Sequence, residues 1–386
     1  FYAITNLFGI GASSLMSRAM GAKEPETVKK ASATGLYFAL LGAILIAAGS
    51  LLFRTPLLNL LGTDEVTFAA TKDYMFWTVS LGSIPCIMSI MFSYLLRAEG
   101  HSLSAGIGQI SGCVLNIILD PFFILPFGLN LGAAGAGLAT FIANCVTFSY
   151  FVIFMIREKE KTQICLKPSY ISFERPVFGS IIVVGVPGVF QNILNVISMT
   201  ILNNIVAGYG PDVVAAVGIS SKINQLPIQI VFGFTQGVMP LIGYNYAGKN
   251  FPRMKETIKK TYALTLSVLI AVLALFSLAG QPLVRVFMDN DVIVTTGARF
   301  LQGFGLSLPF MCIDFMVVGI SQSFGKGKHA LVFSFLRKLA LEIPLILFLN
   351  HMAGVAGIAY AQCLAEFTMA IIAISVQAGL LKECEE

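Results

Sequence analysis

An amide and a carboxylate, Asn116 and Asp120, stand four residues apart in the otherwise apolar sequence NIILDPFFI. Four residues is close to one helical turn, so both side chains lie on one face of a helix. Carboxylate and amide oxygens suit a hard cation, and a carboxylate in a low-dielectric setting also carries protons. Pro121 removes a backbone donor and leaves a carbonyl free. The pattern favours a cation or proton site; the alternative is an aspartate that caps or kinks a helix.

Other polar side chains in apolar segments raise the same question, because an ionisable residue inside a membrane span is a functional candidate. Glu342 follows Arg337 and Lys338, so a structural ion pair competes with a functional role. Glu366 either lines a cavity or pairs with Lys222. The secondary candidates for lining a cavity are Glu342, Asp314, Glu366, Gln191, Asn192 and Asn195.

The composition indicates which elements must hold these residues. Of the 386 residues, 56% are hydrophobic and only 12% are charged, whereas a soluble domain carries about a quarter charged residues. The apolar residues form runs of roughly 20, the length of a membrane-spanning helix. We therefore predict an all-α polytopic membrane protein. Eleven spans or part-spans are expected, near 1–20, 31–53, 69–95, 103–127, 132–156, 177–207, 213–243, 258–280, 292–324, 330–350 and 354–381.

Several classes of function lack support in the sequence. The seven cysteines have no CxxC spacing, which argues against disulfides and zinc. The GAAGAG run lacks the Lys-Ser/Thr of a phosphate-binding loop, and no nucleophile–base set or paired catalytic acids are recognisable. We expect no enzyme activity, no cofactor, no nucleic-acid partner and no metal other than possible Na+ at Asp120.

The basic residues predict the orientation in the membrane. If alternate loops are assigned to opposite sides, one side receives only Arg54, Lys72, Arg285 and Arg299 of the 25 Lys and Arg residues. Nearly all the others, including those of 157–175, fall on the opposite side. Cytoplasmic loops are rich in Lys and Arg, so 157–175 and the C-terminus are expected in the cytoplasm. The net charge of +5 then requires no anionic partner.

The chain also contains an internal repeat, since MSRAMGAKEPETVKKA resembles GYNYAGKNFPRMKETIKKT. The repeat predicts two homologous six-helix bundles, which share one orientation because each has an even number of spans. Eleven spans and a cytoplasmic C-terminus imply that the first helix of the first bundle is missing. The expected bundles are 1–156 and 176–386, joined by a linker at 157–175. The predicted equivalent pairs include Gly21 with Gly248, Gly100 with Gly325, Gly132 with Gly354, and Asp120 with Glu342.

At the level of whole motifs, the sequence resembles the multidrug and toxic compound extrusion (MATE) family, nearest its bacterial DinF-like and MepA-like branches. The resemblance lies in SRAMGAKEPETVKKA, NIILDPFFI, GAAGAGLAT and MPLIGYNYAGKNFPRMKETIKKT. It implies a monomeric antiporter of the bacterial plasma membrane. Such a protein exports amphipathic, often cationic drugs by alternating access, in exchange for H+ or Na+. A flippase of lipid-linked substrates from the same superfamily is the alternative.

The resemblance also implies a binding site in the first bundle. Asn116 and Asp120 would act with the hydroxyl of Thr140 and a backbone carbonyl near Ala136. In the second bundle, Asp314 resembles an acid that other branches place in the tenth span. The acids that sodium-coupled branches carry in the seventh span are replaced here by neutral Gln191, Asn192 and Asn195.

Overall fold

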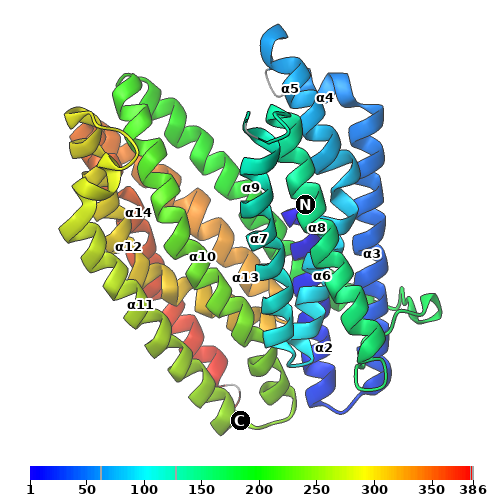
Figure 1. Ribbon diagram of the computed structural model, residues 1–386. Helices are drawn as coiled ribbons and strands as arrows, with labels where there is room; N and C mark the ends of the chain where they lie inside the picture. Colours follow the sequence, from blue (N-terminus) through cyan, green and yellow to red (C-terminus); the bar gives the residue numbers. More distant parts are fainter. Residues whose placement is uncertain (61–62, 127, 383, 385–386) are drawn as a thin grey trace. The chain divides into compact units, whose positions relative to one another are not determined.

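The computed structural model describes residues 1–60, 63–126, 128–382 and 384, which form helices joined by turns and loops (Figure 1). The helices of the first part are α1 (Tyr2–Thr5), η1 (Asn6–Ile10), α2 (Gly11–Gly21), α3 (Pro25–Leu52), α4 (Arg54–Leu60), α5 (Glu65–Met75), η2 (Phe76–Leu81), α6 (Ser83–Ala98), α7 (Ser102–Ile124), α8 (Gly132–Arg157), η3 (Pro168–Tyr170) and η4 (Arg175–Gly179). They are followed by α9 (Ser180–Ala207), α10 (Pro211–Ala247), α11 (Phe251–Arg285), α12 (Asp291–Ser323), α13 (Gly327–Phe335), η5 (Leu336–Glu342) and α14 (Ile343–Lys382).

The described residues include eight helical segments that are long and apolar enough to cross a membrane. A ninth candidate is the pair formed by Thr67–Leu81 and Ser83–Ala98, which is bent by 47°. The prediction of a polytopic all-α protein is confirmed, but eleven spans are not. Residues 2–21 form three consecutive short helices, and α14 joins two predicted spans across a non-helical residue, Gly354.

The exposed surface of α7 indicates a lipid environment. Only 11% of its most apolar stretch is buried. Its exposed side chains include Leu103, Ile107, Ile110, Val114, Ile117 and Ile118. A continuous apolar face of this kind would favour aggregation in water, whereas hydrocarbon solvates it.

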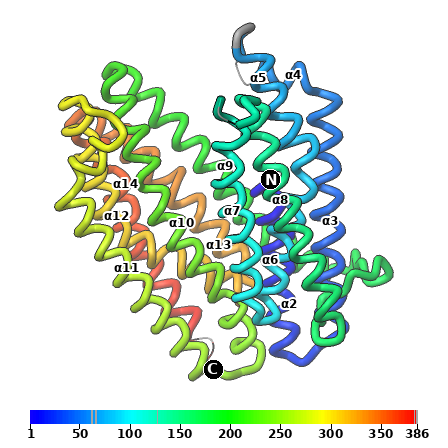
Figure 2. Tube along the Cα trace, in the orientation of Figure 1, coloured from blue at the N-terminus to red at the C-terminus, as the bar shows by residue number. Residues whose placement is uncertain are grey.

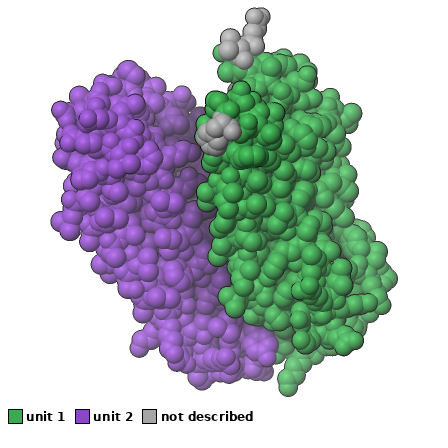
Figure 3. All heavy atoms as spheres, in the orientation of Figure 1, with its two compact units in different colours: residues 1–189 green, residues 190–386 purple. Residues whose placement is uncertain are grey.

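The chain divides into two compact units, residues 1–189 and 190–386 (Figure 3). The boundary falls inside α9, shortly after Pro187, whereas the boundary predicted from the repeat lies at 157–175. In unit 1, Val177 and Ile181 share a buried core with Met16 and Met91, so the start of α9 packs within this unit. The path of α9 can be followed in Figure 2.

In unit 2, α12 is the central helix. Buried residues occupy 72% of its most apolar stretch. Its side chains Leu301 and Leu308 share a core with Val231 of α10 and Leu269 of α11. A helix covered on most sides offers positions where polar groups are shielded from both water and lipid.

The segment 158–174 is bound to unit 1 by the carboxylate of Glu99, directly after α6. Glu99 accepts hydrogen bonds from the Thr162 hydroxyl (2.7 Å) and from the backbone N–H groups of Gln163 (2.5 Å) and Ile164 (2.9 Å). Further along, the Tyr37 hydroxyl donates to the Leu166 carbonyl at 2.7 Å. The predicted linker is therefore held against α3 and the end of α6 within unit 1.

Removal of this carboxylate should release the segment locally. Because a hydrogen bond to a charged group contributes about 1.5–3 kcal/mol, Glu99→Ala is expected to speed amide exchange of residues 162–166 at least about tenfold. Hydrogen–deuterium exchange with mass spectrometry checks this. Glu160→Ala, which removes an exposed acid of the same segment, is the matched control and should leave exchange unchanged. Equal exchange in both variants would contradict the role given to Glu99.

The predicted repeat is visible in the backbone. Three pairs of equivalent residues have positive φ in both units, a conformation that few residues other than glycine adopt. They are Lys23 (61°) with Lys249 (55°), Gly100 (90°) with Gly325 (76°), and Gly132 (55°) with Gly354 (57°). The first pair follows helix ends at Gly21 and Ala247, so the predicted pairing of Gly21 with Gly248 is wrong by one residue.

The contacts of two equivalent glycines favour another partner for Asp120 than the predicted Glu342, and the predicted equivalence itself stays a prediction. A Cβ on Gly135 would clash with the Phe123 carbonyl oxygen, and a Cβ on Gly357 would clash with that of Leu349. These matching contacts make Phe123 equivalent to Leu349. Counting back along α7 and α14 then pairs Asp120 with Ile346, whereas Glu342 lies before α14, at the end of the π-helix η5. The sequence alignment missed this shift because α7 ends in a loop before Gly132, whereas α14 stays helical up to Gly354.

Candidate functional site

Unit 1 holds the predicted amide and carboxylate as a hydrogen-bonded pair on α7. The amide of Asn116 donates to the carboxylate of Asp120 over 3.2 Å, and both side chains are half-buried. Pro121 lies inside the same helix, where it lacks the N–H that would bond to Ile117. The predicted placement on one helix face is confirmed. Whether the pair binds a cation or a proton stays a prediction.

The other two predicted residues form a pair on the neighbouring helix α8. The hydroxyl of Thr140 donates to the carbonyl oxygen of Ala136 at 3.0 Å, and both residues are half-buried. The hydroxyl proton is thereby used within the helix, which leaves the lone pairs of the Thr140 oxygen free, whereas the Ala136 carbonyl accepts both this hydroxyl and the helix N–H of Thr140. Ligands that are all oxygen atoms, as in this pair, are those that a hard cation prefers.

Close contacts between α7 and α8 set the relative height of the two pairs. A Cβ on Gly112 would meet the Thr147 side chain, and a Cβ on Gly135 would meet the Phe123 carbonyl. In this antiparallel register, Asp120 is level with Ala139, next to Thr140. No hydrogen bond joins Asp120 to Thr140 in the described part of the chain. Asp120 and Thr140 are therefore at about one height, whereas Asn116 and Ala136 lie on opposite sides of that level.

Unit 2 holds a second polar centre, around Asp314 of α12. Asp314 and Glu366 of α14 are each only 1% exposed, and Arg337 of η5 is 6% exposed. A nitrogen of Arg337 lies 3.8 Å from a carboxylate oxygen of Glu366. Asp314 and Arg337 line the same small cavity. The predicted alternative in which Glu366 pairs with Lys222 is thus wrong, because its basic partner is Arg337.

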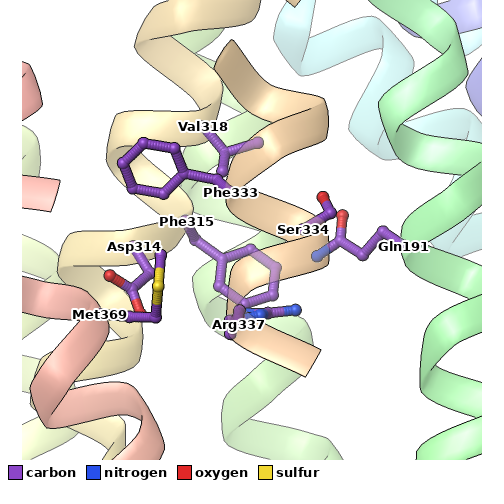
Figure 4. A pocket seen from close by; sticks show the side chains of 8 residues that line it. All are labelled: Gln191, Asp314, Phe315, Val318, Phe333, Ser334, Arg337 and Met369. Carbon is purple, nitrogen blue, oxygen red and sulfur yellow. The ribbon is translucent and has the colours of Figure 1, made fainter. Parts of the chain in front are cut away.

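A small cavity adjoins Asp314 and Arg337. It offers about 10 Å³ to the centre of a water molecule, roughly the room for one water. Figure 4 shows Asp314 and Met369 on one side, Arg337 below Phe315, and Ser334 close to Gln191. The remaining lining residues are Val318 and Phe333.

The three neutral residues on α9 have different surroundings. Gln191 lines this cavity. Asn192 is half-buried, and its amide nitrogen has no hydrogen-bond partner among the described residues. Asn195 is exposed. Of these three candidates, only Gln191 lines the same cavity as Asp314.

Glu342 is held in a buried ion pair. One of its oxygens lies 2.6 Å from the Lys338 ammonium, and the other accepts from Lys338 at 2.8 Å and from the Ser198 hydroxyl at 2.6 Å. Both oxygens are satisfied, so the structural reading predicted from the neighbouring basic residues fits this geometry. Removing one partner of such a pair usually costs more than the pair itself contributes to stability.

Arg337 is the participant that the sequence reasoning missed. Its guanidinium lies 4.8 Å from the centre of the Phe315 ring, in addition to its contact with Glu366. Arginine is rare within apolar spans and marks interior sites, so its occurrence in such a span could have identified Arg337 as a candidate. The sequence reasoning used Arg337 only as a neighbour of Glu342, because its contacts with α12 and α14 depend on helix packing.

Known proteins resemble this chain over nearly its whole length. The MatE family model matches residues 1–122 and 187–348. The multidrug export protein MepA of Staphylococcus saprophyticus is 31% identical over 96% of this chain and 81% of its own length. MepA of Staphylococcus haemolyticus is 30% identical over 97% of this chain and 81% of its own length.

Solved structures share the fold. The Vibrio cholerae MATE transporter VcmN in its bent form superposes with a TM-score of 0.87 at 23% identity, over 99% of this chain and 86% of VcmN. An outward-facing multidrug resistance MATE family transporter gives a TM-score of 0.92 at 21% identity, over 100% of this chain and 85% of the other. These relatives are transporters and export proteins rather than enzymes. The chain therefore belongs to the MATE family and is a MepA-like, multi-pass membrane transporter.

Proposed function

We propose that this protein is an antiporter that exports amphipathic, often cationic compounds by alternating access, in exchange for inward-moving H+ or Na+. The observation that carries the proposal is the Asn116–Asp120 pair on α7, whose carboxylate is level with Thr140 of the Thr140–Ala136 pair on α8. An acid kept in an otherwise apolar helix is costly unless it is used. The relatives named as multidrug export proteins favour small drug-like substrates over the lipid-linked substrates of a flippase.

The coupling follows from a change in charge at Asp120. A ligand shifts a conformational equilibrium only if it binds the two states differently. A carboxylate that binds the incoming cation in one state and loses it in the other meets this condition. Asn116 holds the Asp120 side chain in place, and the oxygens of Thr140 and Ala136 supply neutral ligands.

The proposal also covers the oligomeric state, the number of spans and the orientation in the membrane. We infer a monomer in a bacterial plasma membrane, with eleven spans in this chain and with segment 157–175 and the C-terminus in the cytoplasm. The concentration of Lys and Arg in 157–175 and 249–260 supports this orientation. The three pairs of positive-φ residues at equivalent positions support two bundles of common ancestry, which would then share one orientation in the membrane.

Loss of the amide partner should weaken the site without disabling it. Asn116→Ala removes one neutral ligand, and a neutral hydrogen-bonding partner contributes about 1 kcal/mol. The half-saturating concentration of the coupling cation is therefore expected to rise about fivefold, with the maximal rate retained. The measurement is export of tetraphenylphosphonium by proteoliposomes at varied cation concentration. Asn204→Ala, at an exposed amide of α9, is the control. Complete loss of export in Asn116→Ala would contradict the role of a neutral ligand.

A further inference from the structure

Segment 158–174 of unit 1 runs beside the lower half of α3 in Figure 1, and hydrogen bonds fix its position along that helix. The backbone N–H of Cys165 donates to the Ser32 hydroxyl at 3.0 Å. The backbone N–H of Ser172 donates to the Thr34 hydroxyl, also at 3.0 Å. Both ends of the stretch 165–172 are therefore attached to the same two turns of α3.

These contacts lie where α3 enters the membrane. The helix has 28 residues and is therefore about 42 Å long, whereas the hydrocarbon core is about 30 Å thick. Its polar beginning ends at Lys30, and its long apolar run begins at Leu36. Tyr37, which donates to the carbonyl of Leu166, is of a type that is enriched at membrane–water interfaces. The attached segment is thus level with the edge of the hydrocarbon.

Two apolar side chains of the segment are exposed at this level. The exposed fraction is 74% for Phe173 and 44% for Leu166. The ring centre of Phe173 lies 5.6 Å from that of Phe38 on α3. On the same side of α3, Leu41 and Leu45 follow one and two turns later and are exposed as well. Phe173 therefore continues an apolar surface that hydrocarbon covers.

Two exposed basic residues flank these apolar side chains. Lys167 directly follows Leu166, and Arg175 comes two residues after Phe173. Among the described residues, no carboxylate lies within ion-pair distance of Lys167 or Arg175. Both side chains are therefore able to bind an anion from outside the protein.

The acids of the segment do not compensate these charges. Glu174 lies 3.0 Å from the ammonium of Lys30, and Glu158 lies 2.9 Å from that of Lys161. The remaining acid, Glu160, is exposed and stands seven residues before the first of the two unpaired cations. The charge left at the apolar surface is positive, so a ligand that matches it is anionic at one end and apolar at the other.

We propose that Leu166, Lys167, Phe173 and Arg175 form an interfacial surface that binds an anionic phospholipid of the surrounding membrane. The two apolar side chains contact the upper carbons of the acyl chains, and the two cations contact the phosphate group. Exposed apolar side chains next to Lys or Arg are typical of segments that lie in the membrane interface. A zwitterionic phospholipid has no net charge, so it leaves the two cations uncompensated. This binding goes beyond the proposed transport function and does not depend on Asp120.

The depth of residue 173 tests the apolar part of the interfacial surface. The sequence contains one tryptophan, Trp77, so full-length Trp77→Phe/Phe173→Trp carries a single fluorophore. In nanodiscs, phosphatidylglycerol brominated on its upper acyl carbons should quench this fluorophore, and more strongly than phosphatidylcholine with the same label at the same mole fraction. Trp77→Phe/Glu160→Trp, with the fluorophore at an exposed acid of the same segment, should be quenched little. Equally weak quenching at both positions would overturn the proposal, because the segment would then lie in water.

The charged part of the interfacial surface is tested by Lys167→Gln/Arg175→Gln. Each Lys or Arg near an anionic membrane surface strengthens binding about fivefold, so the double variant should bind phosphatidylglycerol about 25-fold more weakly. The measurement is a lipid titration of the detergent-solubilised protein by native mass spectrometry. Lys161→Gln/Lys260→Gln removes the same total charge from two exposed lysines that have acidic partners, and it should bind the lipid nearly as well as the wild type.

Two results of the titration would contradict a specific site. An equal loss of affinity in both double variants would show that net charge alone attracts the lipid. Equal affinity of the wild type for phosphatidylglycerol and phosphatidylcholine would show that the cations do not select the headgroup. Circular dichroism and Tm establish that each variant is folded. Because neither experiment involves transport, failure of the role proposed for Asp120 would leave both results unchanged.

Discussion

Asparagine in place of Asp120 is expected to abolish cation-coupled export while leaving the protein's abundance in the membrane and its Tm close to those of the wild type. Asn116 can still hydrogen-bond to the new amide at the 3.2 Å seen for the carboxylate. What is lost is the charge. An amide does not take up a proton near neutral pH and lacks the charge that holds a cation, so cation binding no longer biases the conformational equilibrium.

The measurement for Asp120→Asn is accumulation of tetraphenylphosphonium by cells that express the full-length protein, together with its abundance and Tm. Asp212→Asn, at an exposed acid in the first turn of α10, is the matched control and should export normally. A parallel fall in abundance and export would identify Asp120 as a structural cap. Normal export would place the coupling acid elsewhere, with Asp314 and Glu366 as the next candidates.

The second large effect is expected at Arg337. Arg337→Met keeps an apolar side chain of similar length but removes the cation that balances Asp314 and Glu366. Removing one partner of a buried ion pair typically costs about 3–5 kcal/mol, and the contact with the Phe315 ring is lost as well. The free energy of unfolding should therefore fall by about this amount, measured by denaturant titration in detergent.

A second substitution should restore part of this loss. In Arg337→Met/Glu366→Gln, only Asp314 remains ionisable, and it can be buried as a neutral acid. The double variant should therefore be more stable than Arg337→Met alone. Arg299→Met, at an exposed arginine of α12, is the control, because surface charges contribute about 1 kcal/mol or less. Equal stability of Arg337→Met and wild type would contradict the balancing role.

Local sequence spacing predicted some of the site correctly. The interval between Asn116 and Asp120, and that between Lys338 and Glu342, is about one helical turn, so each pair's contact follows from the helix alone. The same holds for Thr140 and Ala136. Such contacts require no knowledge of how helices pack.

Contacts between residues on different helices could not be predicted from sequence spacing. Asp314, Arg337 and Glu366 lie on three elements, and their association depends on the packing of α12 against η5 and α14. The shift that pairs Asp120 with Ile346 has a similar origin. The chain forms a loop between the end of α7 and Gly132, whereas the equivalent residues before Gly354 are helical in α14. A sequence alignment that matches Gly132 with Gly354 does not show that the helices before these two residues differ in length.

The number of spans shows a different limit. Hydropathy marked apolar segments near each long observed helix. Gly354, however, interrupts α14 at one residue, and residues 2–21 are divided by a π-helical turn at η1. Both features are changes of backbone geometry inside apolar sequence. Composition carries little information about them, whereas φ and the hydrogen-bond pattern define them.

Gradient-driven transport by the purified full-length protein tests the central claim most directly. Proteoliposomes would be given an H+ gradient, a Na+ gradient or neither, and movement of tetraphenylphosphonium against its own gradient would be recorded. We predict that one of the two cation gradients drives uphill movement, that a matching ionophore abolishes it, and that Asp120→Asn vesicles do not respond. Uphill movement by Asp120→Asn equal to that of the wild type, or movement by the wild type that is independent of both gradients, would contradict cation-coupled export through Asp120.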